Sequence, residues 1–205
     1  MSKLLPPSEE ESSALTHNFE VRGSYAYYDR NEVDDRPNYY HYLLSKAKIS
    51  ILIWDPYFME TVDPALFEYV KKNGIDIELL TWCNKKRNQD GDNVDAFLDN
   101  LEDVFKRVKV KKYNVVVNCF RKHPRTADRN KDELYMWHDR YLIIDGSDTY
   151  LVGPSMNNLV NFDQSFGVYH VEDEEAKSLI FDKFQKYRRL LKDNVNGWKK
   201  TRHKP

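Results

Sequence analysis

The chain has 205 residues, with 32 Lys and Arg against 33 Asp and Glu, so its formal net charge of −1 points to no particular partner. Its two cysteines, Cys83 and Cys119, exclude a disulfide scaffold and a cysteine-rich zinc module. No apolar run is long enough to span a membrane, and the first residues lack the apolar core of a signal peptide. These features predict a soluble, cytoplasmic protein with no transmembrane segment.

Positive charge is concentrated in two stretches. The stretch from Lys106 to Lys131 has ten Lys and Arg against one acid, and the stretch from Lys183 to Pro205 has nine against one. Such stretches can neutralise the phosphates of a nucleic acid or an anionic membrane. They can equally be a solvated helix end and a loose tail, and the sequence leaves both interpretations open.

The first half of the chain alternates short apolar runs with helical patterns. Residues 1–20, rich in Pro, Ser and Glu, are expected to form a flexible tail. Helices are predicted for three segments: Pro37–Lys46, Asp63–Lys72 and Asn93–Val108. Strands are predicted for three others: Ile49–Trp54, Ile75–Thr81 and Tyr113–Cys119. Strands that alternate with helices favour a parallel sheet with right-handed crossovers.

The second half has a different rhythm. After a charged loop, Arg121–Glu133, three further strands are predicted: Tyr141–Ile144, Thr149–Val152 and Phe166–Val171. Asp145-Gly146 is typical of the turn between the first two. A long helix, Asp173–Leu191, follows, and its predicted core stripe comprises Ala176, Leu179, Ile180, Phe184, Tyr187 and Leu191. We expect an α/β fold, a single domain over residues 21–192 with a mixed sheet flanked by helices, and a basic C-terminal tail over residues 193–205.

One segment carries a pattern with chemical meaning. The run Trp-His-Asp-Arg-Tyr-Leu-Ile-Ile-Asp-Gly contains His138, Arg140 and Asp145 in the form His-x-Arg-x4-Asp. Residues at i and i+2 of a strand point to one face, so His138 and Arg140 are expected to lie together. Ser155 and Asn157 follow the partner strand. An imidazole, a guanidinium and an amide that converge on one point form a receptor for a tetrahedral phosphate.

Each of these residues also has a structural interpretation. His138 can bond a carbonyl at the end of the strand, and Arg140 can pair with Asp139 or another acid. Asp145 can orient a histidine in a two-fold-related arrangement or simply cap the turn, and the small polar residues after the partner strand are common in turns. A chance match to His-x-Lys/Arg-x4-Asp is expected about once in ten such chains, so the motif gains its weight from the strand and hairpin around it.

The segment resembles the signature of the phospholipase D superfamily, His-x-Lys-x4-Asp followed by Gly-Ser-x-Asn. The resemblance extends from about Ala47 to Leu191, and the run Ala47–Tyr57 is similar to the opening strand of that family. It implies a phospholipase D-like domain whose chemistry needs no metal and no cofactor. In that chemistry one histidine attacks phosphorus to give a phosphohistidine, a second histidine protonates the leaving oxygen, and water releases the product.

Carried over by position, the resemblance implies roles for individual residues. His138 is the nucleophile or the acid, and Arg140 and Asp145 complete the catalytic motif. Arg140 also binds substrate phosphate, together with Ser155 and Asn157. None of these residues is expected to bind a metal.

Two departures from the family pattern matter. Arg140 stands where the family has Lys, and Pro154 is inserted in the small polar turn. Arginine binds phosphate bidentately but is not interchangeable with lysine where geometry is tight. The chain also has one motif where the mechanism needs two histidines, so we expect a homodimer with two copies across a two-fold axis, as in small nucleases of the family.

The His-Asp-Arg form also resembles the phospholipase D-like C-terminal domain of MIT-domain proteins, which is regarded as a lipid-binding module. We predict a phosphodiesterase, specifically a metal-independent nuclease with nucleic acid as its partner. The alternative is a catalytically inactive module that binds the phosphates of nucleic acid or of an anionic lipid head group. A third interpretation is a protein-interaction scaffold in which the motif is vestigial.

Overall fold

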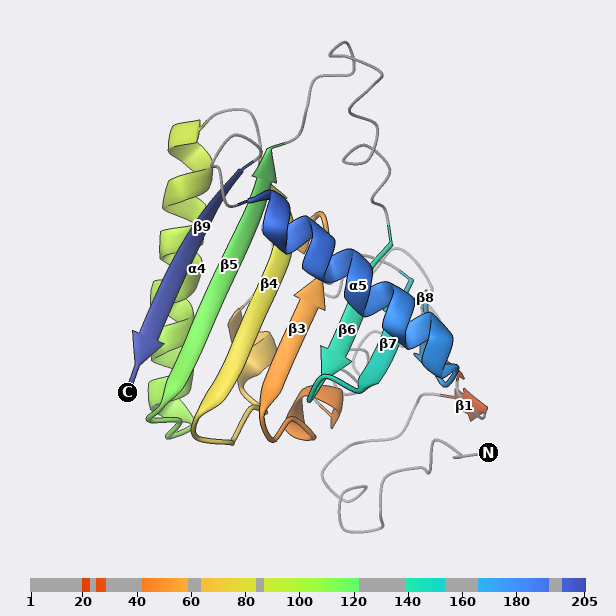
Figure 1. Ribbon diagram of the computed structural model, residues 1–205. Coiled ribbons are helices and arrows are strands. Elements are labelled where there is room, and N and C mark those ends of the chain that lie inside the picture. Colours follow the sequence, from red (N-terminus) through yellow and green to blue (C-terminus); the bar gives the residue numbers. More distant parts are fainter. Residues whose placement is uncertain are drawn as a thin grey trace, which may run out of the picture.

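The computed structural model shows a mixed β-sheet with helices on both faces (Figure 1). It describes residues 20–22, 25–28, 42–58, 64–83, 87–121, 139–153, 166–191 and 197–205. The strands are β1 (Glu20–Arg22), β2 (Tyr25–Tyr28), β3 (Ser50–Trp54), β4 (Ile75–Cys83), β5 (Tyr113–Arg121), β6 (Tyr141–Ile144), β7 (Asp148–Val152), β8 (Phe166–Val171) and β9 (Gly197–Lys204). They form one nine-stranded sheet in the order β1-β2-β8-β7-β6-β3-β4-β5-β9. The predicted α/β fold with a mixed sheet is therefore confirmed.

Parallel and antiparallel pairing meet at β3. Strands β3, β4 and β5 run parallel to one another, whereas β6 runs antiparallel to β3 and β7 antiparallel to β6. The carboxyl ends of β3, β4, β5 and β7 therefore lie at the same edge of the sheet as the start of β6. This is the upper edge in Figure 1, where the arrowheads of β3, β4 and β5 lie.

All six predicted strands are present, as β3 to β8, with bounds that differ from the prediction by no more than two residues. The predicted hairpin is confirmed as well. Asp145 and Gly146 have φ angles of 53° and 74°, which is the left-handed backbone that a tight turn between β6 and β7 requires. Glycine adopts it without strain, and Asp is among the few other residues that tolerate it.

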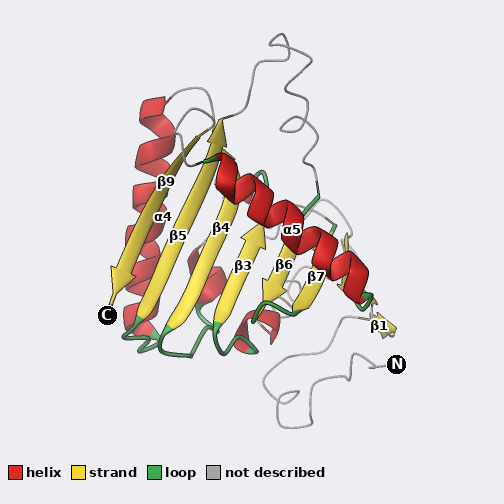
Figure 2. Ribbon diagram, viewed as in Figure 1, coloured by secondary structure: helices red, strands yellow, loops and turns green. Residues whose placement is uncertain are grey.

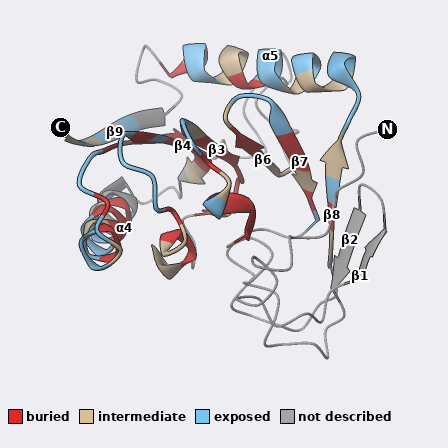
Figure 3. Ribbon diagram, turned by 90° about the horizontal axis from the view of Figure 1, so that it is seen from below, coloured by how far each residue is buried: buried red, intermediate tan, exposed pale blue. Residues whose placement is uncertain are grey.

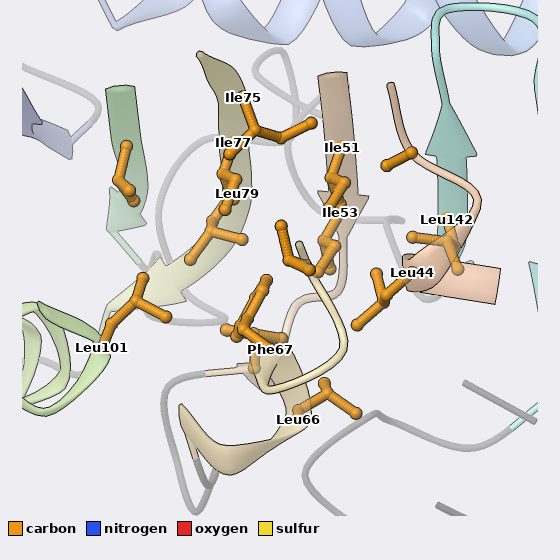
Figure 4. Close-up of a cluster of buried hydrophobic side chains, with 14 of the residues drawn as sticks. Leu44, Ile51, Ile53, Leu66, Phe67, Ile75, Ile77, Leu79, Leu101 and Leu142 are labelled. Carbon is orange, nitrogen blue, oxygen red and sulfur yellow. The ribbon is translucent and has the colours of Figure 1, made fainter. Parts of the chain in front are cut away.

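The sheet separates two hydrophobic cores. On one face, the helix α4 (Arg87–Arg107) and the short 3-10 helix η1 (Pro64–Phe67) cover the larger core, part of which Figure 4 shows. On the other face, the helix α5 (Glu174–Leu190) crosses the strands diagonally and covers a smaller, aromatic core (Figures 2 and 3). The smaller core is built from Trp54, Leu80, Phe120, Phe184 and Leu191. The alternation of β3, β4 and β5 therefore places apolar side chains on both faces.

The helices agree with the prediction less closely. Of the helix predicted over residues 37–46, residues 42–46 are described; residues 42–45 are helical and Lys46 lies in a turn. Helix α4 begins at Arg87, six residues before the predicted start, and it buries an apolar stripe of Val94, Phe97, Leu98, Leu101, Val104 and Phe105. The helix predicted over residues 63–72 is only the four-residue η1, because the chain turns after Phe67 to insert Val70 into the core. In α5, Leu179 was expected in the core but is 61% exposed, since the buried stripe of this helix is narrower.

Among the described residues, no helix is both long and apolar enough to cross a bilayer.

The prediction of a basic C-terminal tail over residues 193–205 is wrong, because Gly197–Lys204 forms β9 at the edge of the sheet. This strand pairs antiparallel with β5 along its whole length. Its polar sequence hides the strand pattern, because the side chains facing α4 are cations rather than apolar groups. At the other end of the chain, the predicted tail over residues 1–20 lies outside the described residues except for Glu20, which opens β1.

Strand β9 is attached to α4 by a row of ion pairs. Its alternate residues face the helix, where Lys200 pairs with Asp95 and Lys204 lies 3.6 Å from Glu102. Between them, Arg202 lies 2.7 Å from Asp99 and 3.2 Å from Glu102. The i, i+2, i+4 spacing of the strand thus matches the i, i+4, i+7 spacing of acids on the helix.

We expect Arg202→Glu to destabilise the fold by about 1 kcal/mol, because it places like charge against Asp99 and Glu102 at a partly exposed pair. Urea unfolding measures the change. The matched control is Lys199→Glu, which makes the same charge change on the exposed face of β9. Equal unfolding midpoints for the two variants would contradict the role of this ion-pair row, and Asp99→Lys should partly rescue Arg202→Glu.

Candidate active site

The motif arginine lies at the edge of the sheet where β3 ends and β6 begins. Trp54 pairs with Tyr141 in the β3–β6 register, so the next residue of β3, Asp55, lies beside the preceding residue of β6, Arg140. On the other side, the Val152 N–H donates to the Arg140 carbonyl at 2.9 Å. Strand register alone therefore brings three segments of the chain together at this point.

Three neighbours hold the Arg140 side chain. Its Nη1 donates to the carbonyl of Gly153 at 2.7 Å, and its Nε lies 3.8 Å from Oδ1 of Asp55. The guanidinium also lies over the ring of Tyr57, 5.5 Å from the ring centre. The sequence left open that Arg140 pairs with an acid, and the structure identifies that acid as Asp55. The side chain remains 22% exposed, so it is held in place without being fully enclosed.

The Asp55 side chain is buried and hydrogen-bonded at this edge of the sheet. Its side chain is fully buried, and its Oδ1 accepts the Tyr57 N–H at 2.9 Å. Its own N–H donates to the carbonyl of Leu80 at 3.0 Å, which extends the β3–β4 pairing by one residue. An Asp followed by Pro56 commonly begins a turn, and here the turn holds the carboxylate against the arginine.

Tyr141 follows the arginine on the side of the sheet that faces α5. Its ring packs edge-on against Trp54, with ring centres 5.4 Å apart. Burial raises the pKa of Tyr141 to about 12, and the charge of Asp139 and a hydrogen bond to it add to this effect. The tyrosine is therefore neutral at any physiological pH, and Asp139 is bonded to it.

Asp145 lies at the opposite end of β6, about 16 Å from Arg140 along the strand. Its carboxylate oxygens accept the backbone N–H groups of residues 48–50 at 2.8 to 3.0 Å. Burial would raise the pKa of Asp145, but these hydrogen bonds and the charge of Lys48 outweigh it and lower the pKa. The hydrogen bonds of this carboxylate therefore go to the backbone that leads into β3, which is a structural role different from capping its own turn. A role in orienting a histidine of a second copy stays a prediction.

The other predicted site residues, His138, Ser155 and Asn157, lie outside the described residues, as does Pro154. In sequence, His138 is two residues before Arg140, and Ser155 is two residues after Gly153, whose carbonyl the arginine binds. Within the described ranges, no group of three or more His, Cys, Asp and Glu side chains is arranged to hold a metal ion. The expectation of chemistry without a metal or cofactor stays a prediction.

The geometry suits the binding of an anion. Ligands of open α/β sheets commonly bind outside the carboxyl ends of the strands, which is where the partly exposed guanidinium lies. An arginine fork complements the oxygens of a phosphate. Sequence reasoning missed Asp55 and Tyr57 as parts of this site, although a buried strand that ends in Asp-Pro was a visible signal.

Two solved structures are similar to this fold. One is the crystal structure of Nuc from Salmonella typhimurium, a phospholipase D family member, with a TM-score of 0.53 and 13% identity over 89% of this chain and 99% of that chain. The other is NucT from Helicobacter pylori, with a TM-score of 0.52 and 16% identity over 84% of this chain and 97% of that chain. No protein-family model matches the chain. No curated protein sequence matches it either.

The predicted phospholipase D-like fold is therefore confirmed. At these identities the likeness concerns the fold alone, and the chemistry of the site has to be argued from the residues of this chain.

We expect Asp145→Asn to destabilise the protein by about 2 kcal/mol at pH 7, because the charged acceptor for three backbone N–H groups is lost. The pKa of this carboxyl is lower in the folded state, so its contribution is complete above about pH 5 and falls as the pH drops through 4 and below. Urea unfolding at a series of pH values measures the destabilisation and its pH dependence. Asp148→Asn, on the exposed side of the same hairpin, is the control and should show neither effect.

Proposed function

We propose that the protein is a metal-independent phosphodiesterase that cleaves nucleic acid, with His138 and Arg140 at its active site. The observation that carries the proposal is the position of Arg140. Its guanidinium is held, partly exposed, at the carboxyl edge of a phospholipase D-like sheet, and it follows His138 by two residues. The names of the similar structures, Nuc and NucT, agree with nuclease activity.

The proposed reaction has two steps. A ring nitrogen of His138 attacks phosphorus, and the bond from phosphorus to the leaving oxygen breaks as the His138 of a second copy gives that oxygen a proton. Water then attacks the phosphohistidine, returns a proton to the second histidine and breaks the nitrogen–phosphorus bond. Arg140, Ser155 and Asn157 bind the phosphate oxygens. Because the chain carries one motif, a homodimer is part of this proposal.

Nucleic acid is favoured as the substrate by the charge near this edge. Strand β5 ends there at Arg121, and a strongly basic sequence follows it up to Lys131. Several of the described cations elsewhere are paired with acidic side chains at the surface. Arg107 pairs with Glu68, and the cations of β9 pair with α4. The basic sequence after β5 is therefore the stretch that we propose for contact with a phosphate backbone.

A second candidate function is a catalytically inactive module that binds phosphate on nucleic acid or on an anionic lipid. One observation favours this function: the Arg140 Nη1 already donates a hydrogen bond to the Gly153 carbonyl, so the arginine has fewer donors left for a substrate. Such a module would bind phosphate without cleaving it.

We expect the wild-type protein to cleave a generic phosphodiester and single- or double-stranded DNA or RNA in EDTA. His138→Ala should lower the rate by at least about 100-fold, because the nucleophile and the proton donor are lost together. Arg140→Ala should also lower it strongly, because the phosphate loses its fixed cation. Initial rates measured at a concentration where a dimer is seen by sedimentation test these expectations.

His203→Ala is the control, because it makes the same change on an exposed residue of β9. Cleavage that EDTA abolishes, or equal rates for wild type and His138→Ala, would contradict the proposed mechanism. No cleavage by the dimer, combined with salt-dependent binding that Arg140→Ala weakens, would establish the binding module instead. Activity of a protein that is monomeric throughout would contradict the homodimer.

A further inference from the structure

The contacts that hold the Arg140 side chain indicate a function for the residues that make them. Three different parts of the guanidinium are engaged by three different segments: Nη1 by Gly153 after β7, Nε by Asp55 after β3, and the planar face by Tyr57. The Nε atom is buried, and within the described residues it has no hydrogen-bond partner. Its contact with Asp55 is thus an ion pair across 3.8 Å, and charge rather than a direct hydrogen bond holds this side of the group.

A buried carboxylate at this position is costly, because it has been removed from water. The turn that follows β3 needs only a side-chain oxygen to accept the Tyr57 N–H, which the neutral Asn would also supply. The negative charge of this carboxylate faces an opposite charge, the Arg140 guanidinium, whose Nε lies 3.8 Å from Oδ1. A charged Asp at this position, in place of a neutral Asn, therefore suits a role toward the arginine.

We infer that Asp55 is a positioning residue that orients the Arg140 guanidinium, so that its remaining donors face the phosphate of the substrate. This inference rests on the proposed function. It also explains why this chain has arginine where the phospholipase D family has lysine. A lysine presents three donors on one atom, and that atom cannot contact Gly153, Asp55 and Tyr57 at separate points and still bind phosphate.

The electrostatics give this role a characteristic kinetic signature. Replacing the Asp55 carboxylate by a neutral amide removes a negative charge beside the phosphate site, so an anionic substrate should bind in the ground state no more weakly than before. The orientation of the guanidinium is lost at the same time, and a misplaced catalytic environment lowers the rate of the chemical step. A loss of kcat without a rise in KM is therefore expected.

We expect Asp55→Asn to lower kcat by about 10- to 100-fold with KM unchanged or lower, measured on the best substrate of the wild type in EDTA. The matched control is Glu78→Gln. Glu78 is another largely buried carboxylate, 3.0 Å from Nε of Arg188, and it binds Asn118 on the face of the sheet that α5 covers. The control removes the same charge from a similar pair and should keep both kinetic constants.

Tyr57→Leu removes the ring face while leaving Asp55 in place, and it serves if Asp55→Asn does not fold. It should lower kcat roughly threefold, which corresponds to the loss of one cation–π contact. Arg140→Lys should be less active than the wild type, even though it introduces the lysine of the family motif.

The NMR signal of the Arg140 Nε–H group gives a readout that does not depend on turnover. It is identified by its loss in Arg140→Lys, and inorganic phosphate is the probe. In the wild type we expect a signal that shifts with phosphate, and in Asp55→Asn a displaced or broadened signal. In Glu78→Gln the signal should match the wild type.

The outcomes separate the two proposals. If the wild type cleaves its substrate but Asp55→Asn has the same kcat and the same Arg140 signal, the positioning role is overturned and the proposed function stands. If the wild type neither cleaves nor responds to phosphate, the proposed function fails, and the inference that rests on it fails too. A rise in KM with kcat unchanged would show that Asp55 supports substrate binding and not orientation, which also overturns the inference.

Discussion

The site depends above all on the register between β3 and β6. That register is fixed at one end by Asp145, whose carboxylate binds the N–H groups that lead into β3. At the other end it places Arg140 beside Asp55. A slip of one residue would turn every side chain of β6 to the opposite face and separate the arginine from the acid. The acid of the sequence motif therefore acts on the site from a distance, by fixing the strand that carries the arginine.

The interior of the fold was predictable because its strands are short apolar runs bounded by turn residues. The strands β3 to β8 follow from hydrophobicity alone, and the Asp145-Gly146 turn follows from the backbone that such residues tolerate. Strands β1, β2 and β9 escaped prediction; of these, β1 and β9 lie at the edges of the sheet, and an edge strand need not be apolar on both faces. In β9 the side of the alternation that faces α4 consists of three partly exposed cations, Lys200, Arg202 and Lys204, and their partners lie on a helix about one hundred residues earlier in the sequence.

The site was predictable only in part. Local spacing identified Arg140 as a residue of interest, because a motif is a property of neighbouring positions. Asp55 and Tyr57 reach the arginine through the pairing of strands distant in sequence; the Asp-Pro pair after β3 marks a turn but does not encode that contact. Asp145 shows another limit of prediction from sequence, because a motif does not identify the partners of its residues. The motif names this residue as part of the site, whereas the structure shows its carboxylate bound to backbone groups at the start of β3.

The row of cations on β9 also bears on the helix it contacts. Without that strand, Asp95, Asp99 and Glu102 would lie along one face of α4 as like charges one turn apart, an arrangement that disfavours a helix. Helix α4 also packs its apolar stripe on the larger core, so its integrity affects the packing beneath β4 and β5. The contacts of β9 with α4 and β5 join residues far apart in sequence, so forming them closes long loops at a cost in chain entropy. The helix thus reaches its full stability only when the last strand of the sheet is in place.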